Sequence, residues 1–120
     1  RTALGDTFQA IQAHAFADPL ADPGQADLTS HVDFEAIAKA SAAAGAKIFA
    51  PVTQSQFLLG CGLLERAGQL GAGLSLNAQD DIRAAVQRLA GTGEGEMGAL
   101  FNALCFAQPD CPKLPPFHAD

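Results

Sequence analysis

Positive charge is scarce in this sequence. Its 120 residues include 7 Lys and Arg against 13 Asp and Glu, which gives a formal net charge of −6. The few cations form no cluster and do not alternate with aromatic residues, as they do in segments that bind nucleic acid. Because a chain of this charge repels phosphate backbones, the composition argues against nucleic acid as a partner.

Long apolar runs and a cysteine framework are missing as well. The uninterrupted apolar stretches fall far short of the roughly 20 residues that cross a bilayer, so we expect no membrane span. Cys61, Cys105 and Cys111 form no Cys-x-x-Cys pair and have no histidine at the spacing of a zinc site. We therefore expect reduced thiols and no metal site, with a Cys105–Cys111 disulfide as the alternative.

The composition that remains is that of a globular protein. Apolar residues make up 48% of the chain and charged residues 17%, which excludes a disordered tail. A chain of this length supports one core, so we expect residues 1–120 to be a single domain or a fragment of one. Because the sequence begins at Arg1 without an initiator Met or a leader, we expect it to be part of a longer protein.

Strand and turn signals alternate in the first third of the chain. The alternation of side chains over residues 8–16 is compatible with a strand, although the Ala and Gln residues there favour a helix. Two Asp-Pro steps and a Pro-Gly step predict a loop over 18–31. A helix is predicted over 34–44, where Asp33 can cap the first turn and Gly45 can end the last one.

A short β-rich run over 47–52 follows that helix. Pro51 belongs at its end, because proline cannot donate to a central ladder. The helix provides a crossover long enough for the strands at 8–16 and 47–52 to pair in parallel. Parallel strands need cover on both faces, and this chain supplies few helices, so we expect part of the cover to lie elsewhere.

Helix signals dominate the second half. Residues 53–56 (TQSQ) match a capping box and predict a short helix through Leu59. A further helix is expected over 63–70, before Gly71. Asn77 resembles a cap, and an apolar stripe predicts a helix over 78–90.

The last thirty residues carry weaker signals. GTGEGE (91–96) indicates a loop, and MGALFNALCFAQ (97–108) could form a helix or a turn followed by a strand. We favour a strand over 101–107. Repeated prolines predict an irregular tail over 109–120. The fold class that results is α/β, rich in helix and with about three strands.

Three segments carry a family resemblance: GDTFQAIQAHAFADPLADPGQADLTSHVDF (5–34), APVTQSQFLLGCGL (50–63) and GEMGALFNAL (95–104). Together they resemble the C-terminal half of the MidA-type S-adenosylmethionine-dependent methyltransferases, a group that includes mitochondrial factors for respiratory complex I assembly. The resemblance covers nearly the whole chain. Its most specific part is 5–34, where the Asp-Pro, Pro-Gly and Asp-Leu-Thr steps follow the family's order and spacing.

The resemblance implies the C-terminal portion of a class I, Rossmann-like methyltransferase fold. In that fold S-adenosylmethionine binds a glycine-rich loop after the first strand, whereas the candidate loop here, 91–95, follows a predicted helix. An intact parent would thus use S-adenosylmethionine, and this chain would bind no cofactor and be inactive alone. The implied substrate is protein arginine, with a complex I subunit as one candidate. The implied location is the bacterial cytoplasm or the mitochondrial matrix.

Four residues are candidates for binding the methyl acceptor. By position after the family's fourth strand, the early loop would face the acceptor, and carboxylates or imidazoles can orient or deprotonate a guanidinium group. The candidates are Asp27, His31, Asp33 and Gln54. Three of them have a structural alternative: Asp27 suits a turn, Asp33 suits a helix cap, and His31 suits a structural hydrogen bond. The sequence identifies no catalytic residue.

If the rest of the methyltransferase were absent, part of the surface of this chain would be uncovered. Ile48, Phe49, Val52 and the apolar residues of 97–104 would be left partly exposed, so we expect a possible homodimer through a sheet edge or an apolar patch. The alternative function is a non-catalytic helical protein-interaction module. It is supported by the lack of a cofactor motif and of a dense catalytic cluster.

Overall fold

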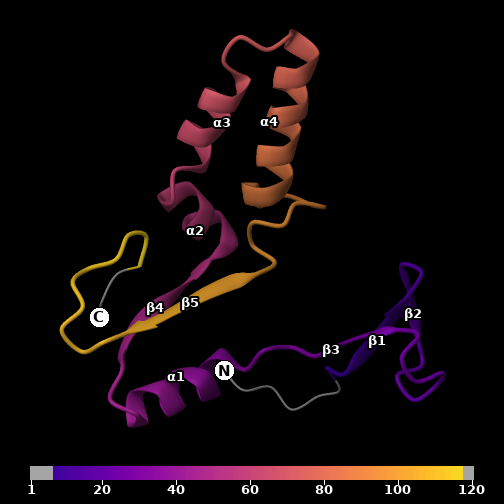
Figure 1. Ribbon diagram of the computed structural model, residues 1–120, viewed down its shortest axis with the longest axis vertical. Coiled ribbons are helices and arrows are strands. Elements are labelled where there is room, and N and C mark those ends of the chain that lie inside the picture. The colour runs from indigo at the N-terminus through magenta and orange to yellow at the C-terminus, as the bar shows by residue number, and fades with distance from the viewer. Residues whose placement is uncertain (1–6, 118–120) are drawn as a thin grey trace. The chain divides into compact units, whose positions relative to one another are not determined.

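The structure is a computed structural model that describes residues 7–117 and has an α/β composition (Figure 1). The chain divides into two compact units, Arg1–Ala40 and Ser41–Asp120. That residues 1–120 form a single domain, or a fragment of one, stays a prediction.

A three-stranded antiparallel sheet forms the first unit. Its strands are β1 (Gln9–Gln12), β2 (Ala15–Ala17) and β3 (Asp27–Thr29), in the order β2-β1-β3. The single strand predicted over 8–16 is therefore wrong. Ala13 and His14 adopt φ angles of +48° and +63°, which turn the chain back after two residues and produce a hairpin. Alternation along the sequence does not distinguish one long strand from two short ones.

The segment 18–31 is mostly loop, as its proline and glycine residues predicted. The Asp18 carboxylate accepts a hydrogen bond from the Leu20 backbone N–H at 2.9 Å, and the Gln25 N–H donates to the Asp22 carbonyl at 3.1 Å. These bonds close two local turns. The loop prediction missed β3, whose three residues pair with β1.

Helix α1 (Phe34–Ala43) follows, as predicted. The Asp33 carboxylate accepts a hydrogen bond from the Ala36 N–H at 2.9 Å, so the predicted cap is confirmed. Gly45 ends the helix with a φ of +86°, a conformation that favours glycine. On the surface, Lys39 pairs with Glu35 at 2.6 Å, and this hydrogen bond raises the lysine pKa.

An antiparallel pair of strands is central to the second unit: β4 (Lys47–Thr53) and β5 (Asn102–Ala107). Both predicted strands are confirmed, but the parallel pairing of 8–16 with 47–52 is wrong. In the described part of the chain β4 pairs with β5 and β1 pairs with β2 and β3, all antiparallel. The register shifts between Phe49 and Val52, where Pro51 lacks an N–H to donate.

Three helices lie between these strands. The capping box is present: the Thr53 hydroxyl accepts from the Gln56 N–H at 3.2 Å, and the Gln56 side chain accepts from the Thr53 N–H at 2.9 Å. It begins α2 (Gln54–Gly60), and Gly62 at a φ of +89° separates this helix from α3 (Leu63–Gly71). Helix α4 (Leu76–Ala90) starts earlier than predicted, because Ser75 is the cap and Asn77 lies inside the helix.

The tail folds back along the second unit. Residues 108–117 contain no helix or strand, and 118–120 lie outside the described residues. The Phe117 ring centroid lies 5.8 Å from that of Phe57 on α2, and the Lys47 ammonium donates to the Cys111 carbonyl at 2.8 Å. Phe117 is one of the few buried side chains.

Burial is sparse over residues 7–117. The buried apolar side chains are Ala10, Phe49, Ala90 and Phe117. Phe49, which was expected to be partly exposed, is fully buried, whereas Ile48 and Val52 are half-buried. Leu100, Phe101 and Phe106 are each at least 50% exposed. Within the described range, no helix has the length and apolar character needed to cross a membrane.

Candidate functional site

Asp27 and His31 present polar groups to solvent. Asp27 lies on β3 opposite Ile11 of β1, and His31 lies in the extended segment between β3 and α1. Both side chains are exposed. Asp27 is therefore a strand residue and does not have the turn role that its sequence context suggested. Both groups remain accessible to a ligand.

Asp33 and Gln54 are engaged with the backbone. Asp33 caps α1, as described above, and belongs with Asp27 and His31 to the first unit. Gln54 begins α2 in the second unit, where its side-chain amide donates to the Leu89 carbonyl at 2.8 Å and its backbone N–H donates to the Phe101 carbonyl at 2.8 Å. These bonds join the start of α2 to the end of α4 and to the start of β5.

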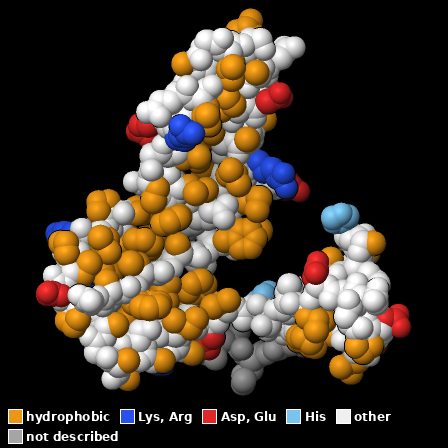
Figure 2. Space-filling view, in the orientation of Figure 1, with side chains coloured by type: hydrophobic (Ala, Val, Ile, Leu, Met, Phe, Trp, Pro, Cys, Tyr) orange, Lys and Arg blue, Asp and Glu red, His pale blue; other side chains and the backbone are white. Residues whose placement is uncertain are grey.

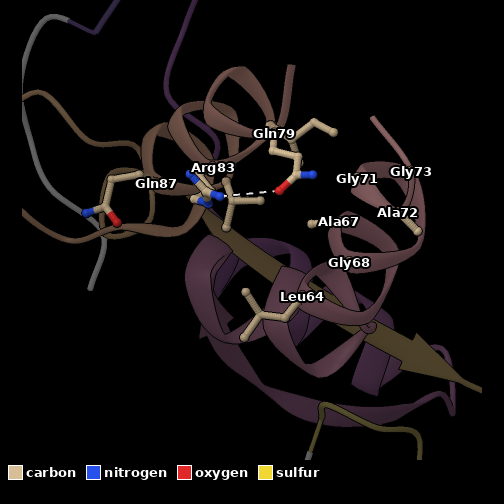
Figure 3. A pocket seen from close by; sticks show the side chains of 11 residues that line it. Leu64, Ala67, Gly68, Gly71, Ala72, Gly73, Gln79, Arg83 and Gln87 are labelled. Carbon is tan, nitrogen blue, oxygen red and sulfur yellow. Dashed lines mark hydrogen bonds between the residues drawn. The ribbon is translucent and has the colours of Figure 1, made fainter. Parts of the chain in front are cut away.

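A cavity of about 570 Å³ lies between α3 and α4 (Figure 3). Small residues of α3 form one side, and α4 supplies the longer side chains of Gln79, Arg83 and Gln87. The full lining is Leu64, Ala67, Gly68, Gly71, Ala72, Gly73, Gln79, Ile82, Arg83, Val86 and Gln87. None of these side chains is a carboxylate, thiol, hydroxyl or imidazole, so the cavity supplies no nucleophile and no general base.

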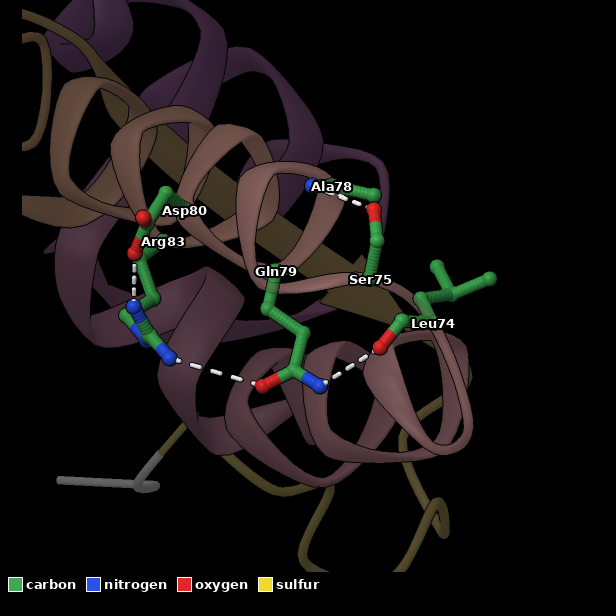
Figure 4. A network of polar contacts seen from close by, with 6 residues as sticks. All are labelled: Leu74, Ser75, Ala78, Gln79, Asp80 and Arg83. Carbon is green, nitrogen blue, oxygen red and sulfur yellow. Dashed lines mark hydrogen bonds and ion pairs between the residues drawn. The ribbon is translucent and has the colours of Figure 1, made fainter.

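The polar side chains along this cavity bond to one another (Figure 4). The Gln79 amide donates to the Leu74 carbonyl at 3.0 Å, and its oxygen lies 3.5 Å from an Arg83 nitrogen. Arg83 also forms an ion pair with Asp80. The network holds the start of α4 against the turn before it. Sequence analysis did not identify this cavity, although the small residues of 67–73 are a signal for close helix approach.

The glycine-rich loop at 91–96 is closed by its own carboxylate. Glu96 accepts hydrogen bonds from the Gln87 side-chain amide and from the Gly93 backbone N–H, the latter at 2.6 Å. Chiefly because of the bond from Gln87, and secondly because of that from Gly93, the pKa of Glu96 is lowered. The loop amides of Met97 and Gly98 donate to the carbonyls of Arg88 and Gly91. These amides therefore bind the chain's own oxygen atoms.

Neither the cysteines nor the acidic residues form a metal-binding group among residues 7–117. Cys61 is exposed, Cys105 and Cys111 are half-buried, and all three are free thiols.

Comparison with known proteins identifies related sequences. Residues 1–52 match the model of a family described as "Putative S-adenosyl-L-methionine-dependent methyltransferase". The chain is 36% identical over 100 residues to the mitochondrial protein arginine methyltransferase NDUFAF7 homolog of Drosophila melanogaster, a match that covers 82% of this chain and 22% of that protein. The Xenopus tropicalis NDUFAF7 is 43% identical over 58 residues, which cover 48% of this chain and 13% of that protein.

Solved structures from Burkholderia thailandensis share the fold. An uncharacterized superfamily protein superposes with a TM-score of 0.75 at 31% identity and covers 88% of this chain and 28% of its own. A "likely methyl transferase" bound to S-adenosyl-homocysteine superposes with a TM-score of 0.74 at 30% identity and covers 90% of this chain and 27% of its own. The matched part of this chain thus spans 22% of the Drosophila relative, 13% of the Xenopus relative, and 28% and 27% of the two solved structures.

Proposed function

Because this chain is a relative of the MidA-type S-adenosylmethionine-dependent methyltransferases, we propose that it forms the C-terminal part of such an enzyme and contacts an arginine acceptor on a protein. The observation that supports this most strongly is the agreement of its fold with a structure that holds S-adenosyl-homocysteine. The exposed apolar residues on both units fit the same proposal, since they are suited to being covered by further chain.

The described residues do not themselves fit the cofactor. A nucleotide loop follows a strand and leaves its amides free for phosphate or carboxylate groups. The loop at 91–96 follows α4, and its Gly93 amide is bound to Glu96. We therefore place the S-adenosylmethionine site of the intact enzyme outside this chain, which on its own would bind no cofactor and transfer no methyl group.

The part assigned to this chain is to bind the acceptor. Asp27 and His31 provide an exposed carboxylate and imidazole, groups that can orient a guanidinium side chain and accept its proton. Asp33 of the first unit and Gln54 of the second unit each remain a candidate for contacting the acceptor, but each would have to do so in addition to its backbone bonds. We further propose that the substrate is a complex I subunit. The location we propose is the mitochondrial matrix or the bacterial cytoplasm.

A non-catalytic interaction module is the second candidate. The α3–α4 cavity favours it, because the lining is apolar apart from Gln79, Arg83 and Gln87 and carries no carboxylate, thiol, hydroxyl or imidazole. A module of this kind would dock a partner through the helices and would function without S-adenosylmethionine.

Calorimetry distinguishes these two functions. S-adenosylmethionine should give no saturable heat with this chain and stoichiometric binding with the longer protein that contains it. Tight binding to the chain alone contradicts the placement of the cofactor, and no binding to the longer protein favours the module.

Methyl transfer to an arginine peptide tests the acceptor role. In the longer protein, Asp27→Asn and His31→Ala should each raise KM for the peptide by about fivefold, as expected for the loss of one exposed polar contact. KM for S-adenosylmethionine should be unchanged in both variants. An unchanged peptide KM would remove these residues from the acceptor site.

A further inference from the structure

One face of the first sheet carries an aromatic ring and a carboxylate in a single row. Phe16 of β2 and Asp27 of β3 are the two cross-strand partners of Ile11, which lies on the central strand. Residues directly opposite in an antiparallel sheet project to the same face. The row Phe16–Ile11–Asp27, named here the aromatic–acidic row, therefore presents its three side chains together.

The two ends of the row are open to solvent. The Phe16 side chain is 78% exposed and that of Asp27 is exposed, whereas Ile11 between them is half-buried. The Phe16 ring therefore contributes little to the core that the described residues of this chain form. Ala10 and Leu28 point to the opposite face, where Ala10 is almost fully buried.

The spacing of the row suits one planar cation. Adjacent strands lie about 4.8 Å apart, so Phe16 and Asp27 are separated by roughly 10 Å at the backbone. A guanidinium group placed over Ile11 lies within about 6 Å of the ring, the range of a cation–π contact, and within reach of the carboxylate. The aliphatic part of an arginine side chain would cover Ile11.

Charge around the row favours a cationic partner. Residues 7–38 contain five Asp and Glu and no Lys or Arg. Figure 2 shows the same pattern on the visible face of the β1–β3 sheet, which carries Asp or Glu side chains and no Lys or Arg. Among the described residues, the Asp27 carboxylate has no ion-pair or hydrogen-bond partner, and its backbone pairs with β1. A second copy of this chain would bring like charges together, and nucleic acid would be repelled.

We propose that the aromatic–acidic row is a docking surface for an arginine side chain of an extended protein segment, with the guanidinium group held between the Phe16 ring and the Asp27 carboxylate. The inference rests on the proposed function and deepens it, because it adds Phe16 and Ile11 to the acceptor surface and specifies guanidinium over ammonium. Among the described strands, β2 and β3 lie at the two edges of this sheet, so their outer backbone groups can pair with a segment that lies along them.

The binding test uses this chain and no cofactor. A labelled nine-residue peptide of Gly and Ser with one central Arg is titrated, and peptides with Lys or citrulline in its place are the matched ligands. The Arg peptide should bind about fivefold more tightly than the Lys peptide, and the citrulline peptide should not saturate. Equal binding of the three peptides overturns the inference.

Paired variants locate the binding on this face. Asp27→Asn should weaken binding of the Arg peptide about fivefold. Asp22→Asn removes the same charge from the loop and should change the affinity less than about twofold. Phe16→Leu keeps an apolar side chain without a ring and should weaken binding about threefold, while Leu28→Ala on the opposite face should not. Equal effects of Asp27→Asn and Asp22→Asn, or no effect of Phe16→Leu, overturn the inference.

The result of the peptide-binding test can be distinguished from the result of the methyl-transfer test. If the row binds the Arg peptide but the longer protein methylates no arginine, the proposed function fails and the docking surface stands. If the longer protein methylates arginine while Phe16→Leu and Asp27→Asn leave peptide binding unchanged, the docking surface fails and the proposed function stands. Circular dichroism of each variant verifies that the exposed substitutions leave the fold intact.

Discussion

At the scale of single residues, the turn between β1 and β2 contains a side chain where glycine is favoured. Ala13 has a φ of +48°, which brings its Cβ close to the backbone. Ala13→Gly should therefore stabilise the hairpin by about 0.5–1 kcal/mol, measured as slower amide hydrogen exchange in β1. The matched control is Ala15→Gly on β2, which has no positive φ and should speed exchange. Slower exchange in both variants would contradict this account.

A second prediction at this scale concerns acid. The pKa of Glu96 is lowered by its bonds from Gln87 and Gly93, so the folded loop is favoured by the ionised carboxylate. The stability that the ionised carboxylate gives to the folded loop is fully present above the ordinary pKa of 4.5. It is lost as the pH falls through the lower pKa that Glu96 has in the folded loop. In NMR spectra, the chemical shift of the Gly93 amide should change with pH below pH 4.5. The Glu96→Gln variant should not show this change. Glu94→Gln, in the same loop, should retain it.

At the scale of elements, the C-terminal tail depends on a glycine of α2. A Cβ at Gly60 would collide with the Pro116 side chain, whereas a Cβ at Gly68 of α3 would meet no atom within 4 Å. Gly60→Ala should therefore destabilise the chain by about 1–3 kcal/mol, and Gly68→Ala should stabilise it by about 0.5–1 kcal/mol. Urea unfolding measures both changes, and limited proteolysis after residue 108 should be faster only in Gly60→Ala. Equal proteolysis would mean that the tail does not rest on α2.

At the scale of the whole molecule, the exposed apolar side chains predict self-association. Phe106 lies opposite Ile48 on the β4–β5 pair and is 55% exposed, and Leu100 and Phe101 are 62% and 50% exposed. A two-stranded sheet with open edges is marginal alone, so a second copy would both cover this surface and extend the sheet. Sedimentation velocity should detect an association that strengthens with concentration.

One pair of variants tests where association occurs. Phe106→Lys adds a charge to the β4–β5 surface and should reduce association, while Leu70→Lys places the same charge on α3, where the side chain is 49% exposed. The second variant should associate like the unmodified chain. A purely monomeric chain at all concentrations would exclude the predicted homodimer.

The sequence alone determined the features that depend on neighbouring residues. Asp33, the capping box at 53–56 and Gly45 specify helix ends through bonds and φ angles within a few residues, so α1, α2 and the end of each were predictable. The strand at 101–107 and the family resemblance were likewise available from the sequence. Asn77 was misassigned because Ser75, two residues earlier, offers an equivalent cap.

Only the tertiary structure decided how strands pair and which side chains share a surface. The alternation over 8–16 is the same for one strand as for a hairpin, and the two-residue turn at Ala13 and His14 selects the hairpin. Antiparallel pairing of β4 with β5 joins segments about fifty residues apart, a distance over which no local preference acts. Strand pairing in the first sheet likewise aligns Phe16 with Ile11 and Asp27, because cross-strand register is a property of the folded sheet and not of any one strand.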